Sequence, residues 1–174
     1  MKRVIRSGVF ETNSSSMHSV TVEKAENYDI NPYVRTEDGI AHFNFGEYGW
    51  EYNCYNDPWN KIEYALTMVA ETEDYQSIQD FYETNGFKMI EDSVKKHTHC
   101  DKIIVDNLNE IKVHYYTNYK GEETCWVEHE GYIDHQSSTD SYLSLQEFLD
   151  DYGLTIDRFL FDRNVTLITD NDNH

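Results

Sequence analysis

Cysteine, proline and glycine are scarce in this sequence of 174 residues, which contains three, two and eight of them. The cysteines, Cys54, Cys100 and Cys125, are too few and too odd in number for a disulfide framework, so we expect reduced thiols and a cytoplasmic location. The low proline and glycine content excludes a collagen-like chain. An aromatic content of 14% excludes full disorder, because burying aromatic side chains compensates for the entropy lost on folding.

Long apolar runs and basic residues are scarce as well. No apolar run approaches the roughly 18 residues that a membrane-spanning helix requires. Residues 1–3 are largely basic but no apolar segment follows them, so we expect no signal peptide. Lys and Arg number 14 against 33 Asp and Glu, a net charge of −19. Because a surface this acidic repels phosphate, we expect no direct contact with nucleic acid, and none with a membrane.

The acidic residues are unevenly distributed along the sequence. Residues 1–24 contain four Lys or Arg against two Glu, so residues 25–174 carry a net charge of −21. No linker rich in Pro, Gly or Ser and no internal repeat divides the sequence. We therefore expect a single domain over residues 1–174, with residues 170–174 as a frayed tail.

The apolar periodicity predicts an α+β fold, a mostly antiparallel sheet with three to four helices. Alternation predicts strands at residues 3–6, 18–24, 40–45, 102–105 and 165–169, and a hairpin formed by residues 111–115 and 125–129. A first helix is predicted to begin at Asp57 and Pro58, and a second to end at Asn85 and Gly86. Further helices are predicted at residues 87–96 and 145–152.

The densest polar segment is residues 11–19, where hydroxyl, amide and imidazole groups follow the first predicted strand. Hydroxyls and backbone amides at the end of a strand can bind an anion such as phosphate, and a neighbouring Arg adds positive charge. The alternative is a structural turn in which Asn and Ser bond to their own backbone, since neither a Gly-x-Ser-x-Gly nor a Gly-x-x-x-x-Gly-Lys motif is present. The ligand-binding candidates are Arg6, Asn13, Ser14, Ser15 and Ser16.

A second polar segment, residues 131–138, contains the adjacent pair Asp134 and His135. A carboxylate can orient an imidazole for proton transfer, and a Ser near a His can act as a nucleophile. If the two polar segments meet in the fold, the catalytic candidates are Ser15, His18, Asp134 and His135. A structural loop is the alternative, because the sequence alone does not bring the two segments together.

Metal-binding residue types are present but poorly spaced. His97, His99 and Cys100 form one group, and Cys125 and His129 form another. A zinc site requires four ligands, usually as two closely spaced pairs, and neither group supplies both pairs. We therefore expect no metal and no cofactor.

Aromatic and acidic residues supply the candidates for a protein interface. Residues 46–59 are rich in Tyr and Trp, which bury large areas at interfaces, although closing one edge of the core is the alternative. Carboxylates in residues 71–74 and 91–92 can take the place of phosphates in a basic groove, whereas a solvated surface is the plainer interpretation. The partner-binding candidates are Trp50, Tyr52, Glu71, Glu73, Asp74, Glu91 and Asp92.

Residues 6–19, RSGVFETNSSSMHS, resemble the opening of a group of small proteins from phages and prophages of Gram-positive bacteria. Residues 46–50, GEYGW, and 133–137, IDHQS, are also similar to segments of that group. The resemblance implies an accessory protein of a mobile element in the cytoplasm of a bacterial host, and it assigns no catalytic role to any residue. Many accessory proteins of this kind bind and block a host component, often one that handles nucleic acid.

Two hypotheses follow from these observations. In the first, an acidic accessory protein without catalytic activity binds and inhibits a basic host protein that handles nucleic acid, such as a defence nuclease, by mimicking nucleic acid. This hypothesis leaves a homodimer open. In the second, an enzyme or binder acts on a phosphate-bearing small ligand held by Arg6, Ser14, Ser15 and Ser16, with His18 or His135 moving protons.

Overall fold

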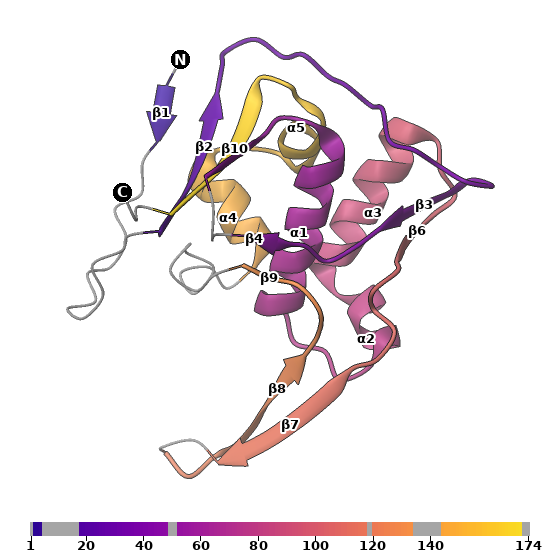
Figure 1. Ribbon diagram of the computed structural model, residues 1–174, viewed down its shortest axis with the longest axis vertical. Helices are drawn as coiled ribbons and strands as arrows, with labels where there is room; N and C mark the ends of the chain where they lie inside the picture. Colours follow the sequence, from indigo (N-terminus) through magenta and orange to yellow (C-terminus); the bar gives the residue numbers. More distant parts are fainter. Residues whose placement is uncertain (1, 5–17, 49–51, 118–119, 134–143, 172–174) are drawn as a thin grey trace.

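Five helices and several small sheets make up the described part of the chain, which the computed structural model gives as residues 2–4, 18–48, 52–117, 120–133 and 144–171 (Figure 1). The α+β class predicted from the sequence is confirmed. None of the described helices combines the length and the apolar character that a membrane crossing requires.

The largest sheet has four antiparallel strands in the order β1 (Lys2–Val4), β2 (His18–Lys24), β10 (Val165–Asn171) and β5 (Asn53–Tyr55). Strands β2 and β10 pair along their full lengths of seven residues. Val22 of β2 lies opposite Leu167 of β10, and both side chains are buried in the core. Segments from the two ends of the sequence therefore form the centre of one sheet.

Helix α1 (Pro58–Thr72) is the central helix of the fold (Figure 1). It begins as the sequence predicts, because Asp57 Oδ1 accepts a hydrogen bond from the Asn60 backbone N–H at 3.0 Å and Pro58 occupies the first turn. Residues 64–70 are all buried, since other elements surround this helix. The neighbours of α1 are α3 (Asn85–Thr98), α4 (Leu145–Tyr152), α5 (Ile156–Phe161), β3 (Ile40–Phe43) and β9 (Tyr132–Ile133).

The boundary between α2 (Ile78–Glu83) and α3 differs from the prediction. Asn85 and Gly86 are predicted to end a helix, whereas they form the first turn of α3. Thr84 separates the two helices, and its Oγ1 accepts a hydrogen bond from the Phe87 N–H at 3.4 Å. Gly86 serves close packing here, because a Cβ at this position would lie 2.4 Å from Val69 Cγ2 of α1.

Helix α4 has the predicted ends, whereas α5 is not among the predicted elements. Ser144 Oγ accepts a hydrogen bond from the Glu147 N–H at 3.2 Å, and Gly153 ends α4 in the left-handed conformation, with φ of 58°. The six residues of α5 are too few to produce a clear helical repeat in the sequence. Burial of its Phe159, Leu160 and Phe161 side chains fixes this short helix against the core.

Two short strand pairs are parallel, β3 with β6 (Lys102–Val105) and β4 (Glu47–Tyr48) with β9. The sequence predicts β3 and β6 but not β4, β5 or β9, which have only two or three residues each. The predicted hairpin is confirmed as β7 (Lys112–Thr117) and β8 (Glu123–Glu128). This hairpin extends away from the helices (Figure 1).

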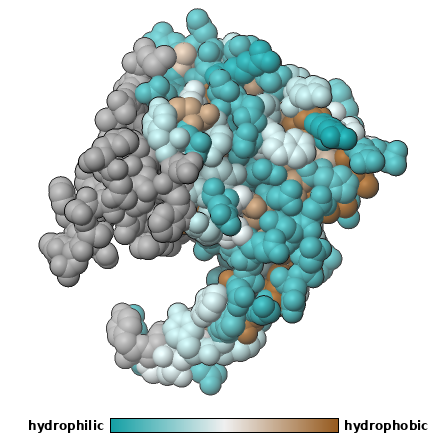
Figure 2. All heavy atoms as spheres, in the orientation of Figure 1, coloured by the Kyte–Doolittle hydropathy of each residue, from teal (hydrophilic) through white to brown (hydrophobic). Residues whose placement is uncertain are grey.

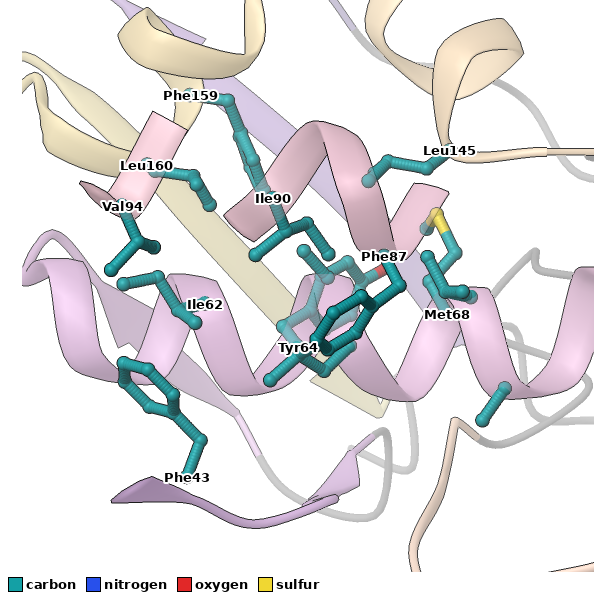
Figure 3. Close-up of a cluster of buried hydrophobic side chains, with 14 of the residues drawn as sticks. Phe43, Ile62, Tyr64, Met68, Phe87, Ile90, Val94, Leu145, Phe159 and Leu160 are labelled. Atoms are coloured by element: carbon teal, nitrogen blue, oxygen red, sulfur yellow. The ribbon is translucent and has the colours of Figure 1, made fainter. Parts of the chain in front are cut away.

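The hydrophobic core lies around α1 (Figure 3). Side chains from α1, α3, α4, α5 and β3 meet there and are almost completely buried. The labelled members of this cluster are Phe43, Ile62, Tyr64, Met68, Phe87, Ile90, Val94, Leu145, Phe159 and Leu160. Their packing holds the helix ends that carry several of the candidate residues in fixed positions.

Two charged residues, Lys61 and Asp162, are fully buried beside this core. Lys61 Nζ donates hydrogen bonds to the backbone carbonyls of Asp162 at 2.8 Å and Val165 at 3.2 Å. Burial lowers the pKa of Lys61 to about 8, and neighbouring carboxylates only partly oppose this change. The Asp162 carboxylate accepts two backbone N–H groups at 2.9 Å and Arg158 Nε at 3.0 Å. These bonds fix the turn between α5 and β10.

Candidate functional site

The residues of the two predicted polar segments lie almost entirely outside the described part of the chain. Arg6, Asn13, Ser14, Ser15 and Ser16 belong to residues 5–17, and Asp134 and His135 belong to residues 134–143. His18 is the first residue of β2, where its backbone lies opposite Asn171 of β10. The catalytic and anion-binding candidates therefore stay predictions.

Of the two aromatic partner candidates, Trp50 also lies outside the described residues, whereas Tyr52 precedes the edge strand β5. The Tyr52 side chain is 61% exposed, and its hydroxyl accepts a hydrogen bond from Cys54 Sγ at 3.1 Å. Tyr52 thus presents most of its surface to solvent at one edge of the four-stranded sheet.

The carboxylates of Glu71 and Glu73 make hydrogen bonds within the fold. Glu71 Oε1 accepts the backbone N–H of Ile133 at 2.6 Å, which joins α1 to β9. Glu73 Oε1 accepts the backbone N–H of Gly86 at 2.9 Å, in the first turn of α3, where N–H groups have no partner inside the helix. Both carboxylates therefore have structural roles, and a binding partner would compete with these bonds.

Asp74 and Asp92 are exposed carboxylates, and the described contacts include no hydrogen bond or ion pair from either side chain. Glu91 differs, because its Oε2 lies 3.1 Å from Lys95 Nζ. Helix α3 carries further lysines, so the charge on its exposed side is mixed. Of the five acidic candidates, Asp74 and Asp92 are the two best placed to contact a partner.

Asp74 borders an open surface depression of about 500 Å³. The lining comes from residues 72–74 at the end of α1, from Asn85, Gly86 and Met89 of α3, and from Ser144 and Gln146 at the start of α4. The start of a helix attracts anions, but here N–H groups of the first turns already bond to side chains of Glu73, Thr84 and Ser144. The depression is therefore poorly suited to an anionic ligand.

A polar cluster joins α3 to α5. Asp157 Oδ1 accepts a hydrogen bond from Ser93 Oγ at 2.7 Å, and Oδ2 contacts Lys96 Nζ. Oδ2 also lies 3.3 Å from His97 Nε2, which has no hydrogen-bond partner of good geometry among the described residues. Partial burial disfavours ionisation of Asp157, but the contacts with Lys96, Ser93 and His97 outweigh it and lower the pKa of this carboxyl. The ionised carboxylate therefore ties the two helices together.

The β7–β8 hairpin exposes aromatic residues that are not among the predicted partner candidates. Tyr115, Tyr116 and Trp126 are 72%, 51% and 51% exposed. The His114 ring stacks on Trp126, with 4.2 Å between ring centroids and 11° between planes, and His114 Nε2 lies 2.8 Å from Glu128 Oε2. Only part of the signal was present in the sequence, because strand alternation places aromatic residues on both faces of the hairpin, whereas the isolation of the hairpin is a feature of the structure.

Within the described ranges, no three His, Cys, Asp or Glu side chains come together in a way that could hold a metal ion. Cys125 Sγ accepts a weak hydrogen bond from Gln76 Nε2 at 3.8 Å. His129 lies against Phe45, with 5.4 Å between ring centroids. These two residues thus make separate contacts within the fold.

Comparisons with protein-family models, with curated proteins and with solved structures found no match to this chain. Its function is therefore inferred from the chemistry of its own residues.

Proposed function

We propose that this chain is a non-catalytic interaction protein that binds a basic host protein and competes with the nucleic acid which that host protein handles. One observation carries the proposal. In the described part of the chain, most cationic side chains bind acceptors of the same molecule, with the exposed Arg35, Lys102 and Arg163 as exceptions, while many carboxylates face solvent without a cation. Figure 2 shows hydrophilic residues over most of the described surface on this side.

The cations make internal contacts in several parts of the fold. Lys24 Nζ donates to the carbonyls of Tyr152 and Gly153, and Lys61 is fully buried. Among the described residues, Lys and Arg form the ion pairs Lys88–Glu83, Lys95–Glu91, Lys96–Asp157, Lys112–Glu128 and Arg158–Asp162. With 14 Lys and Arg against 33 Asp and Glu, such pairs leave a large excess of negative charge.

An excess of carboxylates favours a partner whose own surface is basic. Opposite potentials speed the encounter of two proteins and exclude partners of the wrong charge. A protein that handles nucleic acid has such a surface, because it must attract phosphates. The resemblance of residues 6–19 to phage and prophage proteins supports a bacterial host cytoplasm as the setting, with a defence nuclease as one such target.

The experiment that tests the proposal is affinity capture from a bacterial host lysate at about 50 mM and about 500 mM salt, followed by mass spectrometry. We expect one basic, nucleic-acid-handling protein in stoichiometric amount at low salt and its release at high salt. Added DNA or RNA should displace it. A captured protein that resists both high salt and nucleic acid, or an acidic one, contradicts the proposal.

Charge reversal then tests whether a particular surface is responsible. The double variant Asp74→Lys with Asp92→Lys changes two exposed carboxylates, and Glu26→Lys with Glu37→Lys is a control with the same change of net charge. We expect the first variant to bind the captured partner at least about tenfold more weakly and with a flatter salt dependence than the control. Equal effects of both variants would show that total charge, rather than these positions, determines binding.

A further inference from the structure

The β7–β8 hairpin stands apart from the rest of the described molecule. Six residue pairs join its strands, from Lys112 opposite Glu128 to Thr117 opposite Glu123. Among the described strands, no third strand pairs with either of them, so both edges are open. Figures 1 and 2 show the hairpin as an arm that extends from the body. An isolated two-stranded hairpin is only marginally stable in water, so its presence here as an exposed arm indicates a functional role.

The base of the arm is anchored in the fold. Val127 of β8 and Ile111, just before β7, are partly buried against the hydrophobic core. Farther along the arm, Cys125, opposite Tyr115, accepts the weak hydrogen bond from Gln76, in the segment between α1 and α2. These contacts hold the arm in a defined position.

The arm carries aromatic side chains on both of its faces. Strand alternation places Tyr116 on the same face as Trp126 and its stacking partner His114. Tyr115 lies on the opposite face and is 72% exposed. Tyr and Trp are the residues that most often dominate the energy of protein interfaces. The arm therefore has the composition of a docking element.

The charged residues near these rings indicate which kind of partner the arm can bind. The segment from residue 110 to residue 130 contains Glu110, Glu122, Glu123, Glu128 and Glu130 against Lys112 and Lys120. Lys112 Nζ already lies 3.3 Å from Glu128 Oε1. Faces of aromatic rings attract cations, and carboxylates form paired hydrogen bonds with guanidinium groups. A second copy of this chain is a poor occupant by comparison, because each copy carries a net charge of −19.

We propose that the β7–β8 hairpin is the docking arm of this protein and that it binds an arginine-rich polypeptide segment. Guanidinium groups of the partner stack on Tyr115, Tyr116 and Trp126. The surrounding glutamates neutralise the positive charge of these guanidinium groups. This inference rests on the proposed function, because it names a further surface, besides Asp74 and Asp92, that meets the basic partner. Arginine is preferred to lysine, since the planar guanidinium both stacks on aromatic rings and pairs with carboxylates.

The test measures the binding of fluorescein-labelled oligoarginine and oligolysine peptides to the full chain by fluorescence anisotropy at about 150 mM salt. Tyr115→Ser and Trp126→Ser remove rings of the arm. Tyr33→Ser is the matched control, because Tyr33 is 75% exposed and lies outside the hairpin. We expect each arm variant to bind oligoarginine about threefold or more weakly, the control to bind as the wild type does, and oligolysine to bind more weakly than oligoarginine.

Two further readouts separate the alternatives. Trp126→Ser removes the stacking partner of His114, so Tyr115→Ser decides the outcome if circular dichroism shows that the tryptophan variant loses the hairpin. Unchanged peptide binding by Tyr115→Ser, together with weaker binding by the Asp74 and Asp92 reversals, overturns the docking arm and leaves the proposed function standing. If the wild-type chain is a dimer in sedimentation experiments and Tyr115→Ser dissociates it, the inference is overturned, because the arm then binds a second copy of this chain. The inference is also overturned if the wild-type chain does not bind oligoarginine. The lysate capture experiment tests the proposed function independently of this result.

Discussion

The side-chain carboxylate of Glu73 accepts a hydrogen bond from the backbone N–H of Gly86 at 2.9 Å. This bond connects the end of α1 to the first turn of α3, where the helix dipole also favours a negative charge. A residue that the sequence pattern assigns to an acidic binding surface is thus part of the contact between two helices. The neighbouring Asp74 is exposed instead, and the two carboxylates therefore differ in what their removal should change.

Replacing Glu73 with Ala should lower the free energy of unfolding by about 1 kcal/mol, because it leaves the N–H of Gly86 without its acceptor. Glu73→Gln retains the Oε1 acceptor and should lose less stability. Urea denaturation of both variants measures the difference. Asp74→Ala is the control and should unfold as the wild type does, so equal stability of Glu73→Ala and Asp74→Ala contradicts the structural role.

Gly86→Ala should destabilise the fold by about 1–3 kcal/mol through overpacking. A Cβ at this position would lie 2.3 Å from Glu73 Oε1 and 2.4 Å from Val69 Cγ2. Val69→Ala removes the second of these atoms, so the double variant should be more stable than the sum of the two single effects predicts. Thermal unfolding of the four proteins gives this coupling, and strict additivity would show that α1 and α3 are not in close contact there.

The stability of the wild-type chain should rise between about pH 8 and pH 10 relative to Lys61→Met. Burial lowers the pKa of Lys61 to about 8 in the folded state, so the unfolded chain binds more protons in this interval. The gain is at most about 1.4 kcal/mol per pH unit. Burial raises the pKa of Tyr48 and Tyr75. Their contribution to the stability of the fold therefore falls with pH only above the ordinary tyrosine pKa of 10. Melting temperatures of both proteins across the interval should diverge, and parallel curves contradict the burial of a charged Lys61.

Asp157→Asn should destabilise the chain by about 0.5–1 kcal/mol at pH 5, with a smaller effect at lower pH. The lowered pKa of Asp157 means that its stabilising contacts are fully present above the ordinary pKa of 3.8 and are lost as the pH falls through the folded-state value. Urea titrations from pH 5 to pH 2.5 of wild type and variant provide the measurement. Asp92→Asn changes an exposed carboxylate and should give no such trend, and the same trend in both variants would show that Asp157 is not specially stabilised.

Local signals predict much of this fold. Asp57 with Pro58 begins α1, and Ser144 and Gly153 bound α4, because each of these residues acts on the few backbone groups next to it. Strands β4, β5 and β9 escape prediction because two or three residues acquire strand structure only from a partner far away in the sequence. Gly86 is misassigned for a related reason, since the need for a glycine arises from Val69 of another helix.

The candidate site is less predictable than the fold. Composition predicts the acidic surface, but it does not distinguish Glu71 and Glu73, which bond to backbone N–H groups, from Asp74, which faces solvent. That difference depends on which later segments of the chain fold back against the end of α1. The exposure of Tyr115 and Trp126 follows from strand alternation combined with the isolation of the hairpin, and only the first of these is visible in the sequence.

The pairing of β2 with β10 has a consequence for how the chain folds. During synthesis β2 emerges early, yet its partner on one side consists of residues 165–171, which emerge after every described helix. The central sheet therefore cannot form until those residues are available, and contacts between such distant segments slow folding. Until then the open edge of β2 is exposed to other chains, and the strong mutual repulsion of acidic chains protects against aggregation at that stage.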